Sequence, residues 1–305
     1  MKIAVMGTGG VGGYFGGQLA AAGLDVHFIA RGAHLAALRA HGLQILSPGG
    51  DQLVRPVQAG DDPSEIGPVD VVLFATKLWD VESAGDLCGP LLGPDTAVIS
   101  LLNGIDSEER LIPILGLGHV VGGVAYISAG IAEPGVIQHF AISPAIAFGE
   151  LDGRRSARLD AFDEAARAAG LDARYSDEIE RLIWDKFVFL AAMAGVTALS
   201  RQALGPIRQD PDLRWLLGAA IDEVLAVARA KGVACGVERG QLMQMVDGMA
   251  PGAKASMLMD LEKGNRLEVA WLSGAVARLG DSLGVPTPVH RTIFAALKPF
   301  AAGRG

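Results

Sequence analysis

A glycine-rich turn near the start of the chain is the feature that most constrains the fold. Gly7-Thr8-Gly9-Gly10-Val11-Gly12 follows a strand-like run at Ile3–Met6 and opens a helical pattern. In such a unit the first glycine allows the tight turn, the second lets the backbone approach a pyrophosphate, and the third permits close helix–strand packing. The positive end of the helix dipole then faces the phosphates. The motif predicts dinucleotide binding; the alternative is a structural turn in a chain with 41 glycines.

The rest of the first half alternates short β-branched runs with helical segments. The runs at Val26–Ile29, Val69–Ala75 and Thr96–Leu102 are mostly apolar, which is typical of parallel strands buried on both faces. A helical pattern at Val11–Ala22 stops at a glycine, as helices often do. A turn-rich stretch within Leu43–Val57 predicts a hairpin inserted in this series.

The character of the sequence changes after Tyr175. Strand-like segments continue at Val120–Ile127, Gly135–Phe140, Ala145–Gly149 and Leu171–Tyr175, whereas nearly every segment from Ser176 onward has helical periodicity. The predicted fold class is therefore α/β, with a Rossmann-type, doubly wound domain at 1–175 and an all-helical domain at 176–305. A length of 305 residues agrees with two domains.

Composition excludes several classes of function. Half of the residues are hydrophobic, so the chain is expected to fold, and a net charge of −8 offers no basic field for nucleic acid. Two cysteines and six histidines without ligand spacing predict no metal site. The longest apolar stretch, Phe187–Leu199, is shorter than the ~20 residues that span a bilayer, and no signal peptide fits the first residues. These features favour a cytoplasmic protein that acts on a small molecule.

The end of the second predicted strand bears on the choice of cofactor. A site for NAD usually has an acidic residue there to bind the ribose hydroxyls. This strand ends Phe28-Ile29-Ala30-Arg31-Gly32, and Asp25 lies at its opposite end. A guanidinium at position 31 suits a 2′-phosphate by charge and by geometry. Arg31 therefore favours NADP over NAD; the alternative is a solvated loop arginine.

Two polar residues follow further strands at their carboxyl ends, where open α/β sheets bind ligands. Lys77 comes after the run that ends at Thr76, and Asn103 comes after the run that ends at Leu102. Lys77 is predicted to meet phosphate or ribose oxygens, and Asn103 to anchor the nicotinamide ribose or the substrate. A surface lysine and a turn asparagine are the alternatives.

The helical half contains a lysine in unusually apolar surroundings. Desolvation of Lys186 would lower its pKa and suit it to donate a proton to a developing alkoxide. The alternative is a lysine that reaches solvent and pairs with Asp185 or Glu180. Glu268 is expected on another amphipathic helix, where a solvated glutamate is the alternative. Ser256 lies upstream, where an N-cap role is the alternative.

Together these residues resemble the ketopantoate reductase (2-dehydropantoate 2-reductase) family over essentially the whole chain. The matching positions fall in both halves: Gly7–Gly12, Arg31-Gly32, Thr76-Lys77, Asn103-Gly104, Pro134-Gly135, Trp184-x-Lys186, Thr197-Ala198-Leu199, Ser256-Met257 and Glu268. The resemblance implies a Rossmann domain, a helical domain and an active site between them. It also implies NADPH-dependent reduction of 2-dehydropantoate to pantoate, a step of pantothenate biosynthesis, with a homodimer left open.

The resemblance further implies roles for individual residues. Lys186 is the expected general acid, and Glu268 is expected to bind or orient at the reacting centre. Ser256 is expected to contact the substrate carboxylate. Lys77 and Asn103 are expected to line the cofactor side, with Asn103 also near the substrate.

Three positions depart from the family pattern. Leu190, Ala194 and Leu204 stand where the family has asparagines of the substrate pocket. Leu190 and Ala194 follow Lys186 by four and eight residues and so share its helix face, where we expect both to line the pocket. The substrate is then 2-dehydropantoate or another, more apolar 2-oxo acid. A third hypothesis is a protein that binds NADP(H) without catalysis.

Overall fold

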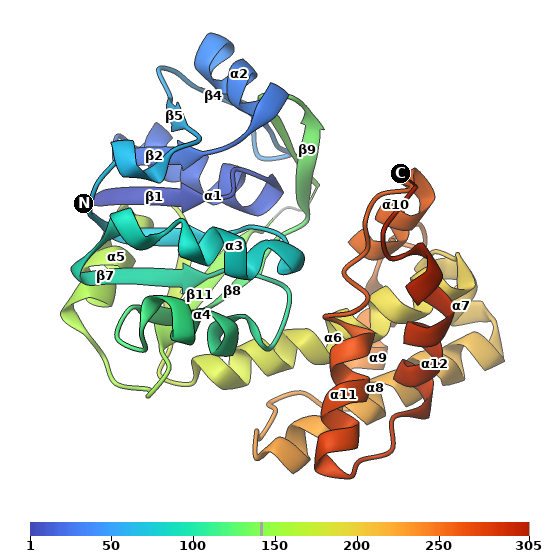
Figure 1. Cartoon of the computed structure of the whole chain (residues 1–305). Helices are drawn as coiled ribbons and strands as arrows, with labels where there is room; N and C mark the ends of the chain where they lie inside the picture. Colours follow the sequence, from blue (N-terminus) through green and yellow to red (C-terminus); the bar gives the residue numbers. More distant parts are fainter. Residues whose placement is uncertain (141–142, 305) are drawn as a thin grey trace. The chain divides into compact units, whose positions relative to one another are not determined.

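The structure is a computed structural model, which describes residues 1–140 and 143–304 (Figure 1). The chain divides into two compact units. One comprises 1–102 and 106–179, and the other comprises 103–105 and 180–305. The main division therefore falls between Ile179 and Glu180 rather than at Tyr175, and the short segment Asn103–Ile105 groups with the helical unit.

An eight-stranded sheet forms the centre of the first unit, which confirms a Rossmann-type α/β fold. Its helices are α1 (Gly10–Ala21), α2 (Gly32–His41), α3 (Val81–Asp86), α4 (Ser107–Leu115) and α5 (Ala157–Ala168). The strands in spatial order are β12 (Asp172–Tyr175), β11 (Ala145–Glu150), β8 (Val120–Tyr126), β7 (Leu92–Ser100), β6 (Val69–Phe74), β1 (Lys2–Met6), β2 (Asp25–Ile29) and β5 (Gln58–Gly60).

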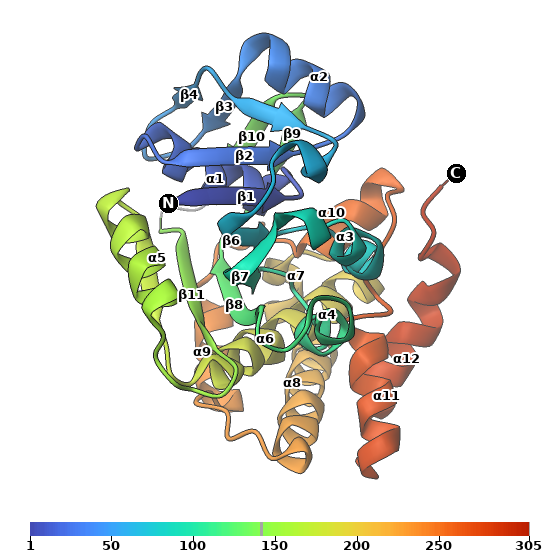
Figure 2. The same ribbon diagram turned by 60° about the vertical axis from the view of Figure 1, so that its left-hand side comes forward.

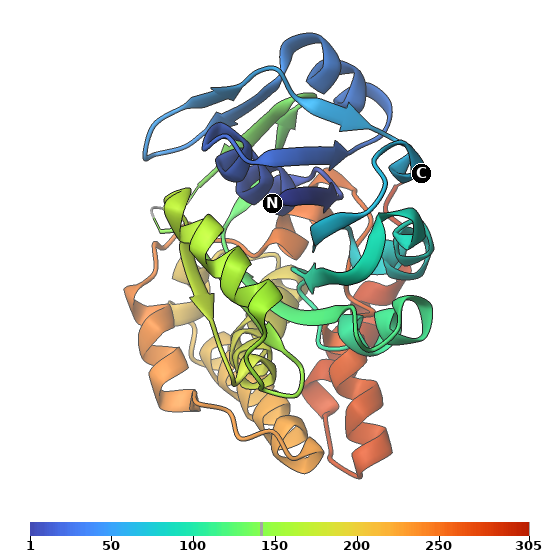
Figure 3. The ribbon, with the colours of Figure 1, turned by 90° about the vertical axis from the view of Figure 1, so that its left-hand side faces the viewer.

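The sheet is parallel apart from one pair, because β11 runs antiparallel to β8. Its central strands are buried on both faces, as their apolar sequences predict. Val5, Leu73 and Ile99 on one face and Ala4, Val72 and Val98 on the other have no exposed surface. Helix α5 packs against β12 and β7 and is seen in front of the sheet in Figure 3.

A second sheet has four strands in the order β4 (Gln52–Val54), β3 (Leu43–Leu46), β10 (Val136–His139) and β9 (Ala129–Glu133). The predicted hairpin is confirmed as the antiparallel pair of β3 and β4. The strand predicted at Gly135–Phe140 belongs to this sheet as β10 and pairs with β3, a partner distant in sequence. Strand β9 was not predicted.

Helix α1 contacts both sheets, and its glycines make this possible (Figure 2). A Cβ on Gly12 or Gly16 would lie within 3 Å of Val5 in β1, and a Cβ on Gly13 would lie 2.8 Å from Ile137 in β10. Gly17 meets Ile45 of β3 at 2.5 Å in the same way. Side chains at these positions would push the helix away from one sheet or the other.

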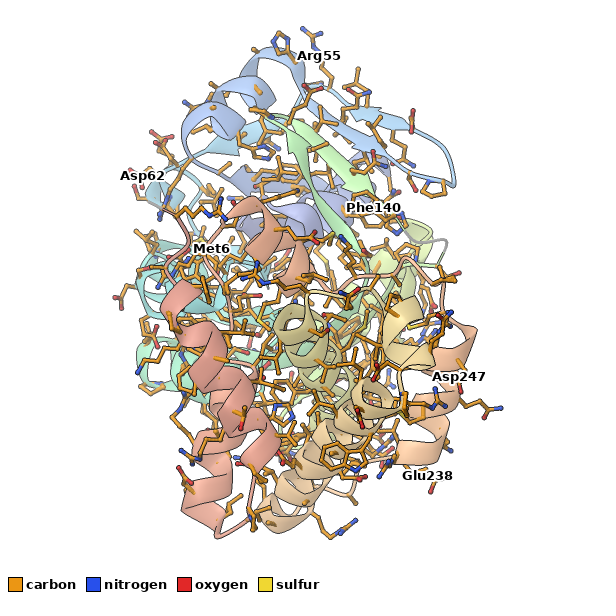
Figure 4. The ribbon with its side chains drawn as sticks, turned by 90° about the vertical axis from the view of Figure 1, so that its right-hand side faces the viewer. Met6, Arg55, Asp62, Phe140, Glu238 and Asp247 are labelled. Atoms are coloured by element: carbon orange, nitrogen blue, oxygen red, sulfur yellow. The ribbon has the colours of Figure 1, made fainter. Side chains whose placement is uncertain are left out.

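The second unit is helical, as predicted. Its helices are α6 (Ile179–Ser200), α7 (Leu204–Gln209), α8 (Pro211–Lys231), α9 (Arg239–Gly248), α10 (Ser256–Lys263), α11 (Ser273–Leu283) and α12 (Pro288–Leu297). Helix α9 begins with a capping box at Glu238, and Asp247 in its last turn pairs with Arg214 of α8 (Figure 4). Buried Glu223 of α8 accepts hydrogen bonds from two N–H groups in the first turn of α12. These caps satisfy helix-end N–H groups.

Helix α6 supplies many residues of the hydrophobic core of this unit. It is long and apolar enough to cross a membrane by length and composition alone, but 61% of its most apolar window is buried inside the structure. Residues from Ala191 to Ala198 are all buried. Its apolar composition is therefore accounted for by packing against the neighbouring helices.

Gly12→Ala should destabilise the protein by about 1–3 kcal/mol, because the added methyl group would lie 2.2 Å from the Gly7 carbonyl oxygen. The matched control is Gly9→Ala, whose Cβ meets nothing within 4 Å and whose stability should stay within about 0.5 kcal/mol of wild type. Urea unfolding of the two variants measures the difference, and equal midpoints would contradict the packing argument.

Candidate active site

The glycine loop has the conformation that the motif predicts. Gly7 has a φ of +97°, and a Cβ there would lie 2.8 Å from the Ala75 carbonyl oxygen. The backbone N–H and the hydroxyl of Thr8 both donate to the Ile29 carbonyl, at 3.2 and 3.0 Å, which ties the loop to β2. The Thr8 side chain therefore stabilises the loop, so the loop would bind a ligand through its backbone N–H groups.

The same loop fits the pyrophosphate of a dinucleotide. Gly9 is the N-cap of α1, and a Cβ on it would point into open space. Gly10 has no such room, since a Cβ there would lie 2.3 Å from the Ala129 carbonyl oxygen. Val11 is half-buried. The free side of the loop thus lies at Gly9, next to the first N–H groups of α1.

Two cations lie at the carboxyl ends of strands that neighbour β1. Arg31 follows β2 as the N-cap of α2 and is exposed. Lys77 follows β6 and is also exposed, with its ammonium 5.6 Å from the centre of the Trp79 ring. Because β2, β1 and β6 are adjacent and parallel, the glycine loop, Arg31 and Lys77 belong to one edge of the sheet. This edge is where such folds bind nucleotides.

In the helical unit, Lys186 of α6 meets Asn103. Its Nζ donates a 2.8 Å hydrogen bond to Asn103 Oδ1. The predicted alternative of a pair with Asp185 is not what the structure has, since the Asp185 carboxylate binds Arg181 at 3.0 Å and the Gly236 N–H at 2.7 Å. Asn103 is therefore more than a turn residue: it links the segment after β7 to the lysine predicted as the acid.

Desolvation is the largest effect on the pKa of Lys186. Burial lowers the pKa of Lys186 from 10.5 to about 8, and the negative charge of Glu268 opposes that fall. Glu268 is itself buried, with 9% of its surface exposed. The lysine is thus poised to give up a proton near neutral pH while a carboxylate still favours its charged form.

The prediction that Glu268 lies on a helix is wrong. Helix α10 ends at Lys263, where Gly264 adopts a left-handed conformation, and Glu268 lies in the segment before α11. A glycine at this position stops a helix by providing the C-cap. The Glu268 carbonyl accepts hydrogen bonds from the N–H groups of Trp271 and Leu272, which fixes its backbone.

Ser256 is exposed at the first position of α10, and the N-cap is Ala255, so the predicted capping alternative is wrong. Leu190 is half-buried on α6, and Ala194 lies further along the same helix with no exposed surface. The role of Ala194 in a substrate pocket stays a prediction. Leu204 is buried at the start of α7.

One buried acid near Asn103 was not predicted from the sequence. Glu108, in the first turn of α4, is 8% exposed and bonds to Ser107 at 2.9 Å. In the sequence Glu108 lies in a polar run, 106–109, directly after Asn103-Gly104-Ile105, and such a run gives no sign of burial. Among residues 1–140 and 143–304, no group of three or more His, Cys, Asp or Glu side chains is arranged to hold a metal ion.

A glycine loop at the start of α1 in a Rossmann-type unit and a desolvated lysine that donates to an asparagine are features expected of an oxidoreductase that uses a nicotinamide cofactor. The comparison with protein families agrees. The model described as ketopantoate reductase PanE/ApbA matches residues 3–153, and its C-terminal counterpart matches residues 178–301. The chain belongs to the ketopantoate reductase family.

Relatives in the family match over nearly their full length. YkpB of Bacillus subtilis, described as an uncharacterized oxidoreductase, is 33% identical over 99% of both chains. The 2-dehydropantoate 2-reductase of Mesorhizobium japonicum is 32% identical over 100% of this chain and 99% of its own. The crystal structure of 2-dehydropantoate 2-reductase from Geobacter metallireducens has a TM-score of 0.91 and 31% identity, over 98% of this chain and 99% of its own.

Glu268→Gln should lower the pKa of Lys186 further, by about 1 pH unit, because the carboxylate that favours the ammonium is lost. Competitive acylation of the lysine amines across a pH series, read by mass spectrometry, measures this directly. Glu262→Gln in α10, which removes an exposed partner of Lys254, is the matched control. An unchanged Lys186 titration in Glu268→Gln would show that the two groups are not coupled.

Proposed function

We propose that this protein reduces a 2-oxo acid to the 2-hydroxy acid with NADPH, and that its substrate is 2-dehydropantoate or a more apolar 2-oxo acid. The observation that carries the proposal is Lys186, whose pKa is lowered to about 8 and whose ammonium donates to Asn103. An acid of this pKa remains protonated at neutral pH and yet releases its proton readily. A protein that only binds NADP(H) has no use for such a group.

The chemistry needs a hydride and a proton. When NADPH is bound at the glycine loop, its dihydronicotinamide would supply the hydride that the substrate carbonyl carbon accepts. The carbonyl oxygen gains negative charge as this happens, and Lys186 Nζ donates the proton that completes the hydroxyl group. Asn103 Oδ1 accepts a hydrogen bond from one N–H group of the ammonium. This contact orients the ammonium so that a second N–H group can point toward the substrate oxygen.

Two further residues have proposed roles, Glu268 toward Lys186 and Ser256 toward the substrate. The negative charge of Glu268 keeps Lys186 protonated until transfer. The exposed hydroxyl of Ser256, at the first turn of α10, is suited to donate to the substrate carboxylate beside helix N–H groups.

The proposed cofactor site binds NADPH through backbone N–H groups and through the positive charges of two side chains. The N–H groups that follow Gly9 bind the pyrophosphate, since the loop is open at that position. Arg31 binds the 2′-phosphate, and Lys77 meets phosphate or ribose oxygens at the same edge of the sheet. No acidic side chain follows β2 to bind a ribose hydroxyl pair, which favours NADPH over NADH.

A more apolar substrate is the second candidate, and Leu190 is the observation that favours it. Leu190 is half-buried and follows Lys186 by one helical turn of α6. A leucine offers no hydrogen bond to a distal substrate hydroxyl, so burying that hydroxyl costs about 1–3 kcal/mol.

Arg31→Ala should weaken NADPH binding far more than NADH binding, by about 1.5–3 kcal/mol, because a charge-assisted contact to the 2′-phosphate is lost. Titration of the protein with each cofactor by calorimetry measures both affinities. Arg39→Ala, also in the region of α2, removes an exposed arginine and is the matched control. Equal losses for NADPH and NADH would contradict the assignment.

Lys186→Ala should cut turnover by roughly 10²–10⁴ while NADPH affinity changes little. In the wild type, the rate should be constant at low pH and fall about tenfold per pH unit above pH 8, because the acid is then deprotonated. Lys254→Ala, in the same unit and exposed, is the control. Near wild-type turnover in Lys186→Ala would remove this lysine from the mechanism.

The substrate is decided by comparing kcat/KM for 2-dehydropantoate and for its analogue without the distal hydroxyl. We expect the analogue to be reduced at least as efficiently, and Leu190→Asn to shift the ratio toward 2-dehydropantoate. A wild-type preference for 2-dehydropantoate of 100-fold or more, about 2.7 kcal/mol, would contradict the apolar pocket.

A further inference from the structure

Three buried side chains form a hydrogen-bonded chain at the base of the segment that carries Asn103. Ser100 is the last residue of β7, and Ser107 and Glu108 are the first two residues of α4. Their exposed fractions are 0%, 1% and 8%. Ser107 Oγ lies 2.9 Å from Ser100 Oγ and donates to Glu108 Oε2 at 2.9 Å.

The chain has a defined direction when Glu108 is ionised. Because the Ser107 proton goes to the carboxylate, Ser100 donates to Ser107. Burial raises the pKa of Glu108 to about 7. Its own N–H and the hydrogen-bonded serine hydroxyls oppose this rise, and the charge of Asp106 adds to it. No cation is paired with Glu108 in the part of the chain that the structure describes.

Such a cluster is poorly explained by stability alone. Apolar side chains would fill the same space without the desolvation penalty of a buried acid. The hydrogen bonds instead hold the end of β7 at a set distance from the start of α4, which closes the loop 101–106 at its base. The Leu101 N–H adds a 2.8 Å bond to the Phe74 carbonyl of β6.

The tip of this loop is held by different contacts. Ile105 is 8% exposed and belongs to the hydrophobic core of the helical unit. Asn103 Oδ1 accepts the hydrogen bond from Lys186 Nζ. A loop that is fixed at its base by hydrogen bonds and at its tip by packing leaves the Asn103 side chain little freedom.

We propose that Ser100, Ser107 and Glu108 are positioning residues, which hold Asn103 where its carboxamide oxygen orients Lys186 Nζ for proton transfer. This inference rests on the proposed function of Lys186 as the acid. Its effect on Lys186 is nevertheless measurable without substrate, because the carboxamide oxygen favours the charged form of the amine.

Glu108→Ala tests the proposal. It should lower kcat by about 10- to 100-fold, part of the effect of removing a general acid, and leave the KM for NADPH unchanged. The pKa of the Lys186 amine, measured by competitive acylation without substrate, should fall, while Glu268, the charged group that acts on Lys186, stays in place.

Two matched variants show whether the effect of Glu108→Ala comes from lost positioning of Asn103 or from a damaged fold. Glu108→Gln keeps an oxygen that accepts the Ser107 hydroxyl and should restore kcat to within about 3-fold of wild type. Glu109→Ala removes the exposed neighbour in the same helical turn and should change neither kcat nor the Lys186 titration. Failure of Glu108→Gln to restore kcat would overturn the proposal.

A double-mutant cycle with Asn103→Ala completes the test. If Glu108 acts through Asn103, then Glu108→Ala should change kcat by less than about 2-fold in the Asn103→Ala background. Additive losses, or an unchanged Lys186 titration in a folded variant, would overturn the proposal. If Glu108→Ala does not fold, Ser107→Ala removes the middle link of the chain with a smaller change in volume and is measured in its place.

The two proposals fail in different ways. A wild-type protein that reduces no 2-oxo acid, while Glu108→Ala still lowers the pKa of Lys186, would refute the proposed reaction and leave the positioning role supported. An active wild-type protein whose Lys186 titration does not respond to Glu108→Ala would refute the positioning role alone.

Discussion

The close approach of α1 to β1 is the constraint on which the nucleotide-binding half depends. Gly12 lets the helix lie against the Gly7 carbonyl oxygen, and Gly13 and Gly17 let its other side lie against Ile137 and Ile45. The helix is thus packed between two sheets by glycine on both faces. The same approach brings the N-terminus of α1 and the open side of Gly9 to the carboxyl edge of the sheet, where phosphate binding is expected.

In the helical half, the comparable constraint is the desolvation of Lys186. An amine in apolar surroundings loses its proton unless neighbouring groups favour the charged form. Here burial lowers the pKa of Lys186 to about 8 against the opposing charge of Glu268, and Asn103 accepts a hydrogen bond from the ammonium. Both partners come from irregular segments outside α6: Asn103 follows β7, and Glu268 precedes α11. The environment of Lys186, the proposed acid, therefore depends on how these two segments are held.

The sequence predicted what is encoded locally. The glycine loop, the hairpin of β3 and β4 and the helical second half follow from short-range patterns, and each is confirmed. The pairing of β10 with β3 could not be predicted, because the two strands are distant in sequence and their apolar patterns are compatible with either sheet. Glu268 was misplaced because Gly264 was overlooked as a stop signal. Glu108 was missed because an acid in a polar run gives no sign that it is buried.

The contacts that hold Lys186 explain how the proposed substrate pocket can change while the proposed acid is kept. Lys186 is fixed by residues that do not belong to its own helix, so a substitution one or two turns further along α6 leaves its hydrogen bond and its charge partner in place. In the proposed reaction, Leu190 in place of the family's asparagine changes what the pocket can bind and leaves the proton donor as it is. The proposed roles thus assign the reaction type and the choice of substrate side chain to separate residues of one helix.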